Sequence, residues 1–177
     1  MTLLSPEKQV LLDAFQQHVD AELRKDLDTT LSTMTSNPHI NNIPTLIGGV
    51  GLEGVKHFYS SLIPSGKFFP ADTEIVPVSR TIDESQLVDE IIFKFTHNSE
   101  IGWMLPNIAP TGKRVEVPLV VIVGFENNKL THEHIYWDQA SVLLQIGLLD
   151  AKGLPIYGIE TANKMDELGE RLMRNKA

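Results

Sequence analysis

Apolar residues recur at helical spacing over the first third of the chain, which predicts three helices. The first runs from Pro6 to about Arg24, and a serine before a proline is typical of a capped helix start. A second, short helix is predicted from Asp26 to Met34, and a third from Glu53 to Leu62. Between them, residues 39–54 carry four glycines and one proline, which predicts a loop. This loop lacks the Lys-Ser or Lys-Thr ending of a phosphate-binding loop, so nucleotide binding is not expected.

Beyond Phe69 the pattern changes to the alternation and the β-branched residues of strands. Four strands are predicted, over residues 74–80, 86–97, 114–126 and 129–137. Asn127 and Asn128, between the last two, tolerate the positive φ angles of a hairpin turn. Helices first and strands later, joined by turns too short for crossover helices, predict an α+β fold with an antiparallel sheet.

Two short helices are predicted after the sheet, from Ala140 to Leu149 and from Met165 to Met173, with a glycine- and proline-containing link from Gly153 to Gly158. No repeat or interdomain linker interrupts the 177 residues. The chain is therefore predicted to be one domain, with a core of about residues 5–149 and a C-terminal extension of residues 150–177.

The charge balance narrows the possible partners. With 15 Lys and Arg against 23 Asp and Glu, the net charge is −8, and the basic residues are scattered, so nucleic acid is not an expected partner. The absence of cysteine excludes disulfides and thiolate metal sites, and it fits a reducing compartment. The first residues do not resemble a signal peptide and no apolar run is long enough to span a membrane, so a cytoplasmic protein is expected.

The predicted strand over residues 86–97 places ionisable and aromatic side chains on one face. Alternate residues of a strand share a face, so Asp89, Phe93, Phe95 and His97 are expected to lie together. Such a face fits the wall of an apolar pocket with a few polar groups. These four residues are therefore substrate-binding candidates.

His132, His134, Tyr136 and Asp138 share one face of the last predicted strand. If the sheet curves around a cavity, this face and that of the strand 86–97 meet inside it. Burial there raises the pKa of a carboxyl group toward values useful for proton transfer. Asp138 with His134 is therefore the preferred acid/base pair, and Tyr136 is a substrate-binding candidate. The alternative is that these groups cap turns or face solvent.

Three further residues are candidates for the cavity mouth. Trp103 and Met104 lie in the link between two strands, where they would cover a cavity or make ordinary core or subunit contacts. His39, in the predicted glycine-rich loop, would reach the same mouth or lie on the surface.

Metal binding is not predicted. His132 and His134 lie two residues apart with Glu133 between them, but a metal site needs three or four ligands from several elements, and the sequence places no third ligand. The Gly-x-Ser-x-Gly turn of serine hydrolases is also missing.

Four segments, together with the order of elements, resemble a known family. They are TLIGGVGLEGVKHFYSSLIP, DEIIFKFTH, WMLPNIAPTGKRVEVP and EHIYWDQASVLLQIGLLD, the last being the most specific. The chain is similar to SnoaL-like proteins of the nuclear transport factor 2-like (NTF2-like) superfamily. This resemblance implies a cone-shaped α+β fold with a curved sheet, a pocket open at one end, and a homodimer packed through the sheet.

The resemblance also implies a chemistry. SnoaL-like polyketide cyclases close a ring by an intramolecular aldol condensation without cofactor or metal, using an aspartate near the end of a late strand. Asp138 best matches that position. The Asp-Arg-Asp set of the superfamily's epoxide hydrolases has no counterpart that we find here, which puts epoxide opening in doubt.

Two hypotheses of function follow. The first is a cofactor-independent acid/base enzyme, of the cyclase, isomerase or lyase type, acting on a small apolar carbonyl compound. The second is a dimeric protein that binds a small ligand, or a partner, without catalysis. Catalysis requires a carboxyl group with a perturbed pKa within reach of the ligand, whereas binding requires only shape and apolar area.

Overall fold

The computed structural model describes residues 4–174, in which the chain forms five helices and six strands. The helices are α1 (Pro6–Leu23), α2 (Leu27–Ser32), α3 (Gly51–Leu62), α4 (Gln139–Gln145) and α5 (Glu160–Arg174). The strands are β1 (Met34–Asn42), β2 (Ile47–Val50), β3 (Glu74–Ile82), β4 (Gln86–Thr96), β5 (Arg114–Glu126) and β6 (Lys129–Trp137). Residues 1–3 and 175–177 of the predicted domain lie outside the described residues.

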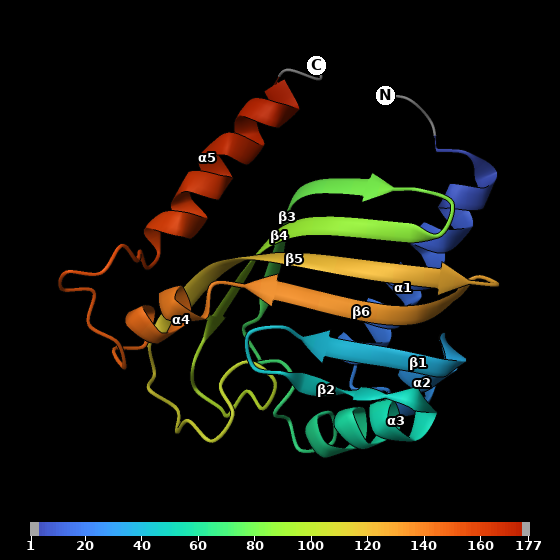
Figure 1. The fold of residues 1–177 in the computed structure, drawn as a ribbon, viewed down its shortest axis with the longest axis horizontal. Coiled ribbons are helices and arrows are strands. Elements are labelled where there is room, and N and C mark those ends of the chain that lie inside the picture. Colours follow the sequence, from blue (N-terminus) through green and yellow to red (C-terminus); the bar gives the residue numbers. More distant parts are fainter. Residues whose placement is uncertain (1–3, 175–177) are drawn as a thin grey trace.

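The six strands form one sheet in the order β2-β1-β6-β5-β4-β3 (Figure 1). Neighbouring strands are antiparallel except β1 and β6, which run parallel. The predicted α+β class is confirmed, and the sheet is open and mixed rather than wholly antiparallel. None of the described helices is both long and apolar enough to cross a membrane.

The elements predicted from periodicity form where the local chemistry supports them. The hydroxyl of Ser5 accepts a hydrogen bond from the backbone N–H of Lys8, which caps α1, and a proline follows at the first helical position. Asn127 and Asn128 adopt φ angles of 51° and 61°, as the hairpin between β5 and β6 requires. α5 extends five residues further toward the N-terminus than its predicted start at Met165.

The prediction of a loop over residues 39–54 is wrong, because this segment contains the end of β1, all of β2 and the start of α3. The glycines allow close backbone approach rather than flexibility. A Cβ added to Gly49 would lie 2.3 Å from the backbone carbonyl of Gly54 in α3. Strand β2 therefore packs directly against the helix that follows it.

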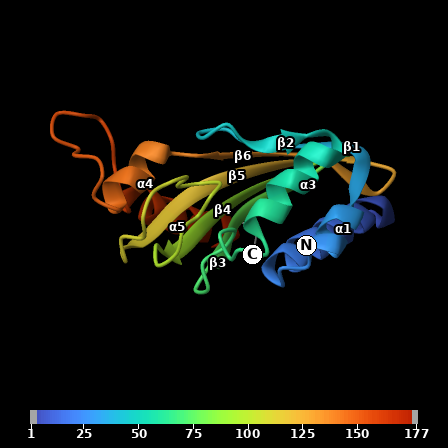
Figure 2. The ribbon, with the colours of Figure 1, turned by 90° about the horizontal axis from the view of Figure 1, so that it is seen from below.

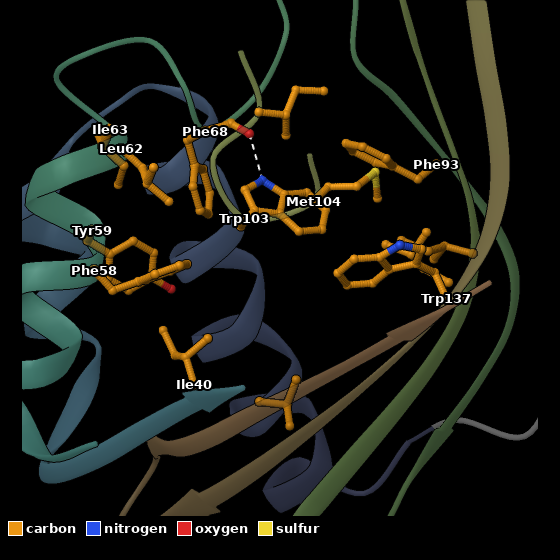
Figure 3. Packing of buried hydrophobic residues seen from close by; sticks show 14 of the residues in the cluster. Ile40, Phe58, Tyr59, Leu62, Ile63, Phe68, Phe93, Trp103, Met104 and Trp137 are labelled. Carbon is orange, nitrogen blue, oxygen red and sulfur yellow. Dashed lines mark hydrogen bonds between the residues drawn. The ribbon is translucent and has the colours of Figure 1, made fainter. Parts of the chain in front are cut away.

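The inner face of the sheet is covered by α1 and α3, which lie on the same side of it (Figure 2). Aromatic side chains fill much of the space between helices and sheet (Figure 3). Trp103 fixes this packing, because its indole N–H donates a hydrogen bond of 2.7 Å to the carbonyl of Phe68. On the outer face, α5 covers part of β3 and β4 through the contact of Ala162 with Val78 and Ile92.

Candidate functional site

A cavity of about 320 Å³ lies between α1, α3 and the inner face of the sheet. Most of its wall is aromatic or aliphatic, as is usual for small-molecule sites. The lining residues are Phe15, Gln16, Val19, Glu22, Leu23, Ile40, Asn42, Phe58, Tyr59, Phe68, Phe69, Ile75, Pro77, Arg80, Asp89, Ile91, Phe93, Trp103, Leu119, Val121, Glu133 and Ile135. Ionisable side chains form two groups, on this wall or directly behind it.

The first is a buried cluster of His18 and Glu22 from α1, Tyr59 from α3 and Glu133 from β6, which we call the inner cluster. The Nε2 atom of His18 lies 3.4 Å from Glu22 and 3.6 Å from Glu133. The hydroxyl of Tyr59 lies 3.0 Å from the same nitrogen, 2.7 Å from Glu22 and 3.3 Å from Glu133. All four side chains are less than a tenth exposed, so their charges act with little screening.

The other nitrogen of His18 shows how the ring is held. Its Nδ1 lies 2.6 Å from the hydroxyl of Thr33, and that hydroxyl donates to the carbonyl of Thr30. The hydroxyl hydrogen is thus already engaged, so Nδ1 carries a proton and donates to the oxygen of Thr33. Nε2 is left to face the two carboxyl groups.

The pKa values of His18, Glu22 and Tyr59 in the inner cluster are shifted from their ordinary values. Burial opposes protonation of His18, but the nearby carboxylates of Glu133 and Glu22 outweigh it and raise the histidine pKa from 6.5 to about 10. Burial also raises the pKa of Glu22, and the charge of His18 lowers it only in part. The pKa of Tyr59 is raised well above 10 by burial and by the same two carboxylates, so its hydroxyl stays a hydrogen-bond donor.

The second group of ionisable side chains on the wall is the ion pair of Arg80 on β3 with Asp89 on β4. Two guanidinium nitrogens of Arg80 each lie 2.5 Å from a carboxylate oxygen of Asp89, which makes a bidentate pair. The guanidinium also lies 5.8 Å from the ring centre of Phe15 on α1. Asp89 is thus held by a fixed positive partner, whereas the carboxyl groups of the inner cluster share a titratable one.

The side-chain amide of Asn42 has an oxygen atom that accepts no hydrogen bond from the described residues. Its side-chain N–H donates a hydrogen bond of 3.0 Å to the carbonyl of Ile47, which fixes the orientation of the amide. Among the described residues, nothing donates to the buried Oδ1 atom of this amide. Asn42 lines the cavity, so the buried Oδ1 atom lies next to the space that a ligand would occupy.

The inner cluster also has the composition of a metal site, since His18, Glu22 and Glu133 each offer a ligand atom within 4.8 Å of the others. With a pKa of about 10, however, His18 would have to release a proton to bind a metal ion at neutral pH, and this weakens binding. The arrangement is already explained by hydrogen bonds and ion pairs among its own members.

Three of the residues predicted from sequence line the cavity: Asp89, Phe93 and Trp103. Phe95, His97 and Met104 are fully buried nearby but do not line it. His97 contacts the hydroxyl of Thr111 at 3.1 Å, and burial lowers its pKa.

The remaining predicted residues lie away from the cavity. Asp138 is exposed and caps α4, where its carboxylate accepts hydrogen bonds from the backbone N–H groups of Ala140 and Ser141. His39, His134 and Tyr136 lie on the outer face of the sheet. The cavity is lined instead by the opposite face of β6, which carries Glu133 and Ile135, because α1 and α3 pack against that face.

Sequence reasoning missed most of the inner cluster. The signal was present in α1, where His18 and Glu22 fall on the same helical stripe as Leu11 and Phe15. Ionisable residues four apart within an apolar stripe indicate a buried pair. The contribution of Glu133 depends on which face of β6 the helices cover, and alternation alone does not determine that.

No protein-family model matches the sequence, and no curated protein matches it. Solved structures do resemble the chain. A candidate SnoaL-like polyketide cyclase from Jannaschia sp. CCS1 superimposes with a TM-score of 0.67 at 18% identity, over 85% of this chain and 100% of that one. A candidate polyketide cyclase from Xanthomonas campestris gives a TM-score of 0.58 at 15% identity, over 80% and 99% of the two chains.

AclR from Streptomyces galilaeus, described as a candidate hydroxylase, gives a TM-score of 0.60 at 19% identity, over 81% of this chain and 88% of that one. These neighbours share one architecture but carry different described activities. At such low identity the likeness establishes the fold, and the activity has to be argued from the site.

Proposed function

We propose that this chain, which has the SnoaL-like fold of the NTF2-like superfamily, is a cofactor-independent acid/base enzyme that moves a proton on a small, largely apolar carbonyl compound. The observation that supports this most is the inner cluster: a histidine flanked at 3.4 and 3.6 Å by two buried carboxyl groups on the wall of an apolar cavity. Buried carboxyl groups with a shared charge partner are typical of proton-transfer sites.

In this proposal Glu133 is the base. Its carboxyl group lines the cavity, 3.6 Å from Nε2 of His18, and it takes the proton from the carbon next to the carbonyl group. Negative charge then develops on the carbonyl oxygen. Tyr59 donates a hydrogen bond to that oxygen, because its raised pKa keeps the hydroxyl protonated, and Glu22 lies beside it at 2.7 Å.

His18 is a positioning residue, since it is fully buried and does not line the cavity. Returning the proton from Glu133 to another carbon gives isomerisation. Attack of the enolate carbon on a second carbonyl group closes a ring and leaves an alkoxide, which takes the proton back from Glu133. The candidate cyclases among the structural neighbours fit the second outcome.

The free Oδ1 atom of Asn42 suggests one feature of the substrate. A buried acceptor without a donor costs free energy, and a hydroxyl or N–H group of the ligand would satisfy it. We expect hydroxylated carbonyl compounds to bind more tightly than analogues that lack the hydroxyl group. Thermal-shift titration of matched pairs of such compounds measures this difference.

The alternative function is a non-catalytic ligand-binding or interaction protein. It is favoured by one observation: the polar atoms of the inner cluster are hydrogen-bonded to one another, so the cluster is complete without a substrate. In that case the cavity would provide shape and apolar area alone.

The experiment is a thermal-shift screen against small aromatic, lactone and polyketide-like carbonyl compounds, followed by mass spectrometry and by NMR of proton exchange in D₂O. We expect Glu133→Gln to lower turnover or exchange by at least about 100-fold, because removal of a general base has effects of that size. Asp138→Asn is the comparison, since asparagine also caps helices.

Comparing Glu133→Gln with Asp138→Asn shows which of the two carboxyl groups is the base. Loss of activity in Asp138→Asn alone would support the sequence-based pair of Asp138 and His134 and reject Glu133. Stabilisation of the parent and both variants by a compound that none of them converts would favour the binding protein.

A further inference from the structure

Three histidines gather on the outer face of the sheet, on the side away from the cavity. We call His39, His132 and His134 the outer histidine cluster. His39 of β1 pairs in register with His132 of β6, and His134 follows two residues later on the same face. The proposed mechanism uses none of them, because Glu133 between the two β6 histidines points to the opposite side.

The rings of this cluster are in contact. The Nε2 atoms of His39 and His134 lie 2.9 Å apart. The ring centres of His39 and His132 lie 5.0 Å apart in a stacked arrangement, and those of His132 and His134 lie 4.7 Å apart. Each of the three side chains is partly exposed, so solutes can reach the cluster from solvent.

The position of His132 depends on the neighbouring strand. Its register partner on β5 is Gly124, and a Cβ added there would lie 2.2 Å from the ring of His132. The glycine therefore provides the space that the imidazole occupies. The hydroxyl of Thr131 lies 3.0 Å from the Nδ1 atom of this ring, which leaves Nε2 free.

We propose that the outer histidine cluster binds a divalent transition-metal ion that prefers imidazole ligands, copper(II) or nickel(II). Two metal–nitrogen bonds of about 2.05 Å that meet at a right angle place their nitrogens about 2.9 Å apart. The Nε2 atoms of His39 and His134, which share a hydrogen bond, have this separation, so the ion would take the place of the shared proton. Right angles are the geometry of square-planar and tetragonal copper(II) and nickel(II) sites, whereas tetrahedral zinc requires a wider separation.

Among the described residues, the ring nitrogens of these three histidines do not all lie within 4.8 Å of one another. His132 becomes the third ligand by turning its ring about the Cα–Cβ bond, which exchanges its contact with Thr131 for one between Nε2 and the ion. Water completes the coordination from the solvent side. The ligands then come from two strands that are far apart in sequence, and the pairing of β1 with β6 holds their backbones at a fixed spacing.

The charge state of the cluster also fits metal binding, in contrast to the inner cluster. Burial and the neighbouring His134 lower the pKa of His39, while burial together with His134 and His39 lowers that of His132. Neutral imidazole is the form that ligates metal. His39 and His132 are therefore available as neutral ligands at pH 7, where His18 of the inner cluster is protonated.

The test is isothermal titration of the chain, without an affinity tag, with copper(II) and nickel(II) at pH 7. Electron paramagnetic resonance of the copper complex counts the nitrogen ligands. We expect one saturable ion per chain with two or three coordinated nitrogens. His39→Gln and His134→Gln should each weaken binding by at least about tenfold. His57→Gln, which removes one exposed histidine on α3, should leave binding unchanged.

Several results would overturn the proposal: absence of saturable binding, equal weakening by His57→Gln, or a copper signal with fewer than two nitrogens. Loss of binding in Glu133→Gln but not in His39→Gln would place the ion in the inner cluster instead. Circular dichroism of each variant verifies that it is folded. None of these readouts depends on catalysis, so the proposed enzyme activity stands or fails separately.

Discussion

His18 is the residue on which the buried charges depend. A single fully buried imidazole faces two carboxyl groups that are each less than a tenth exposed, so its proton compensates charge that would otherwise be costly to bury. Its folded pKa of about 10 lies above the value of 6.5 for an unperturbed histidine. The folded chain therefore binds this proton more tightly than the unfolded chain does.

This difference predicts a pH dependence with a definite sign. The stabilisation contributed by protonated His18 is complete below about pH 6.5 and is lost as the pH rises toward about 10. We expect His18→Gln to lower the melting temperature strongly at pH 6.5 and much less at pH 9.5. Melting curves of both proteins across this range measure the difference.

His57→Gln serves as the matched control, because that histidine is exposed on α3 and should show no such trend. A difference between parent and His18→Gln that stays constant or grows with pH would contradict a protonated His18 in the folded chain.

Alternation along a strand was enough to predict which side chains share a face of the sheet. Asp89 and Phe93 share a strand face, and that face does line the cavity. Prediction from sequence failed for β6, because alternation separates two faces without saying which one the helices cover. It also failed for His18 and Glu22, whose partners come from β6 and α3, far along the chain.

Among the elements, helices α1 and α3 and strands β3 to β6 were predicted close to their observed positions. Each carries a periodic pattern that burial of one face imposes. β1 and β2 were missed, since their sequences contain asparagine, proline and glycine rather than β-branched runs. β1 is a strand through its pairing with β6, which is a contact that local sequence does not report.

The close packing of β2 on α3 leads to a prediction with a built-in control. A Cβ at Gly49 would lie 2.3 Å from backbone atoms, whereas one at Gly54 would meet nothing nearer than 3.4 Å. We expect Gly49→Ala to destabilise the fold by about 1–3 kcal/mol. Gly54→Ala should stabilise it by about 0.5–1 kcal/mol, because alanine favours helices. Urea denaturation of both variants measures these changes, and equal effects would contradict the observed packing.

The start of α4 gives a second prediction at this scale. Asp138 accepts hydrogen bonds of 2.9 and 3.2 Å from two backbone N–H groups that the helix itself leaves free. Asp138→Ala is expected to cost about 1 kcal/mol of unfolding free energy, and Asp138→Asn much less. Chemical denaturation measures both, and a loss of stability as large in Asp138→Asn would show that the charge matters rather than the cap.

For the molecule as a whole, the homodimer implied by the family resemblance remains a prediction. α5 covers only part of the outer face of the sheet, and the face of β5 and β6 that carries Val120 and Tyr136 faces outward in the single chain. We expect analytical ultracentrifugation to give twice the chain mass of 19.7 kDa. Val120→Lys should shift the mass toward one chain, because it places a charge on this face.

Val10→Lys, on the exposed side of α1, is the control and should leave the mass unchanged. The same face holds the outer histidine cluster, so the measurement is made with and without EDTA. A single-chain mass for the parent under both conditions would reject the dimer.

The parallel pairing of β1 with β6 has a kinetic consequence. It joins residues 93 to 96 apart in sequence, and Tyr59 and Glu133 of the inner cluster are 74 apart. Loop closure over such distances must occur before these contacts stabilise the fold, which slows folding relative to a chain with mostly local contacts. During synthesis, β1 emerges from the ribosome long before the strand that will pair with it. The edge of β1 that pairs with β6 therefore stays unpaired until β6 has been synthesised. We expect a chaperone that covers such edges to raise the yield of folded protein.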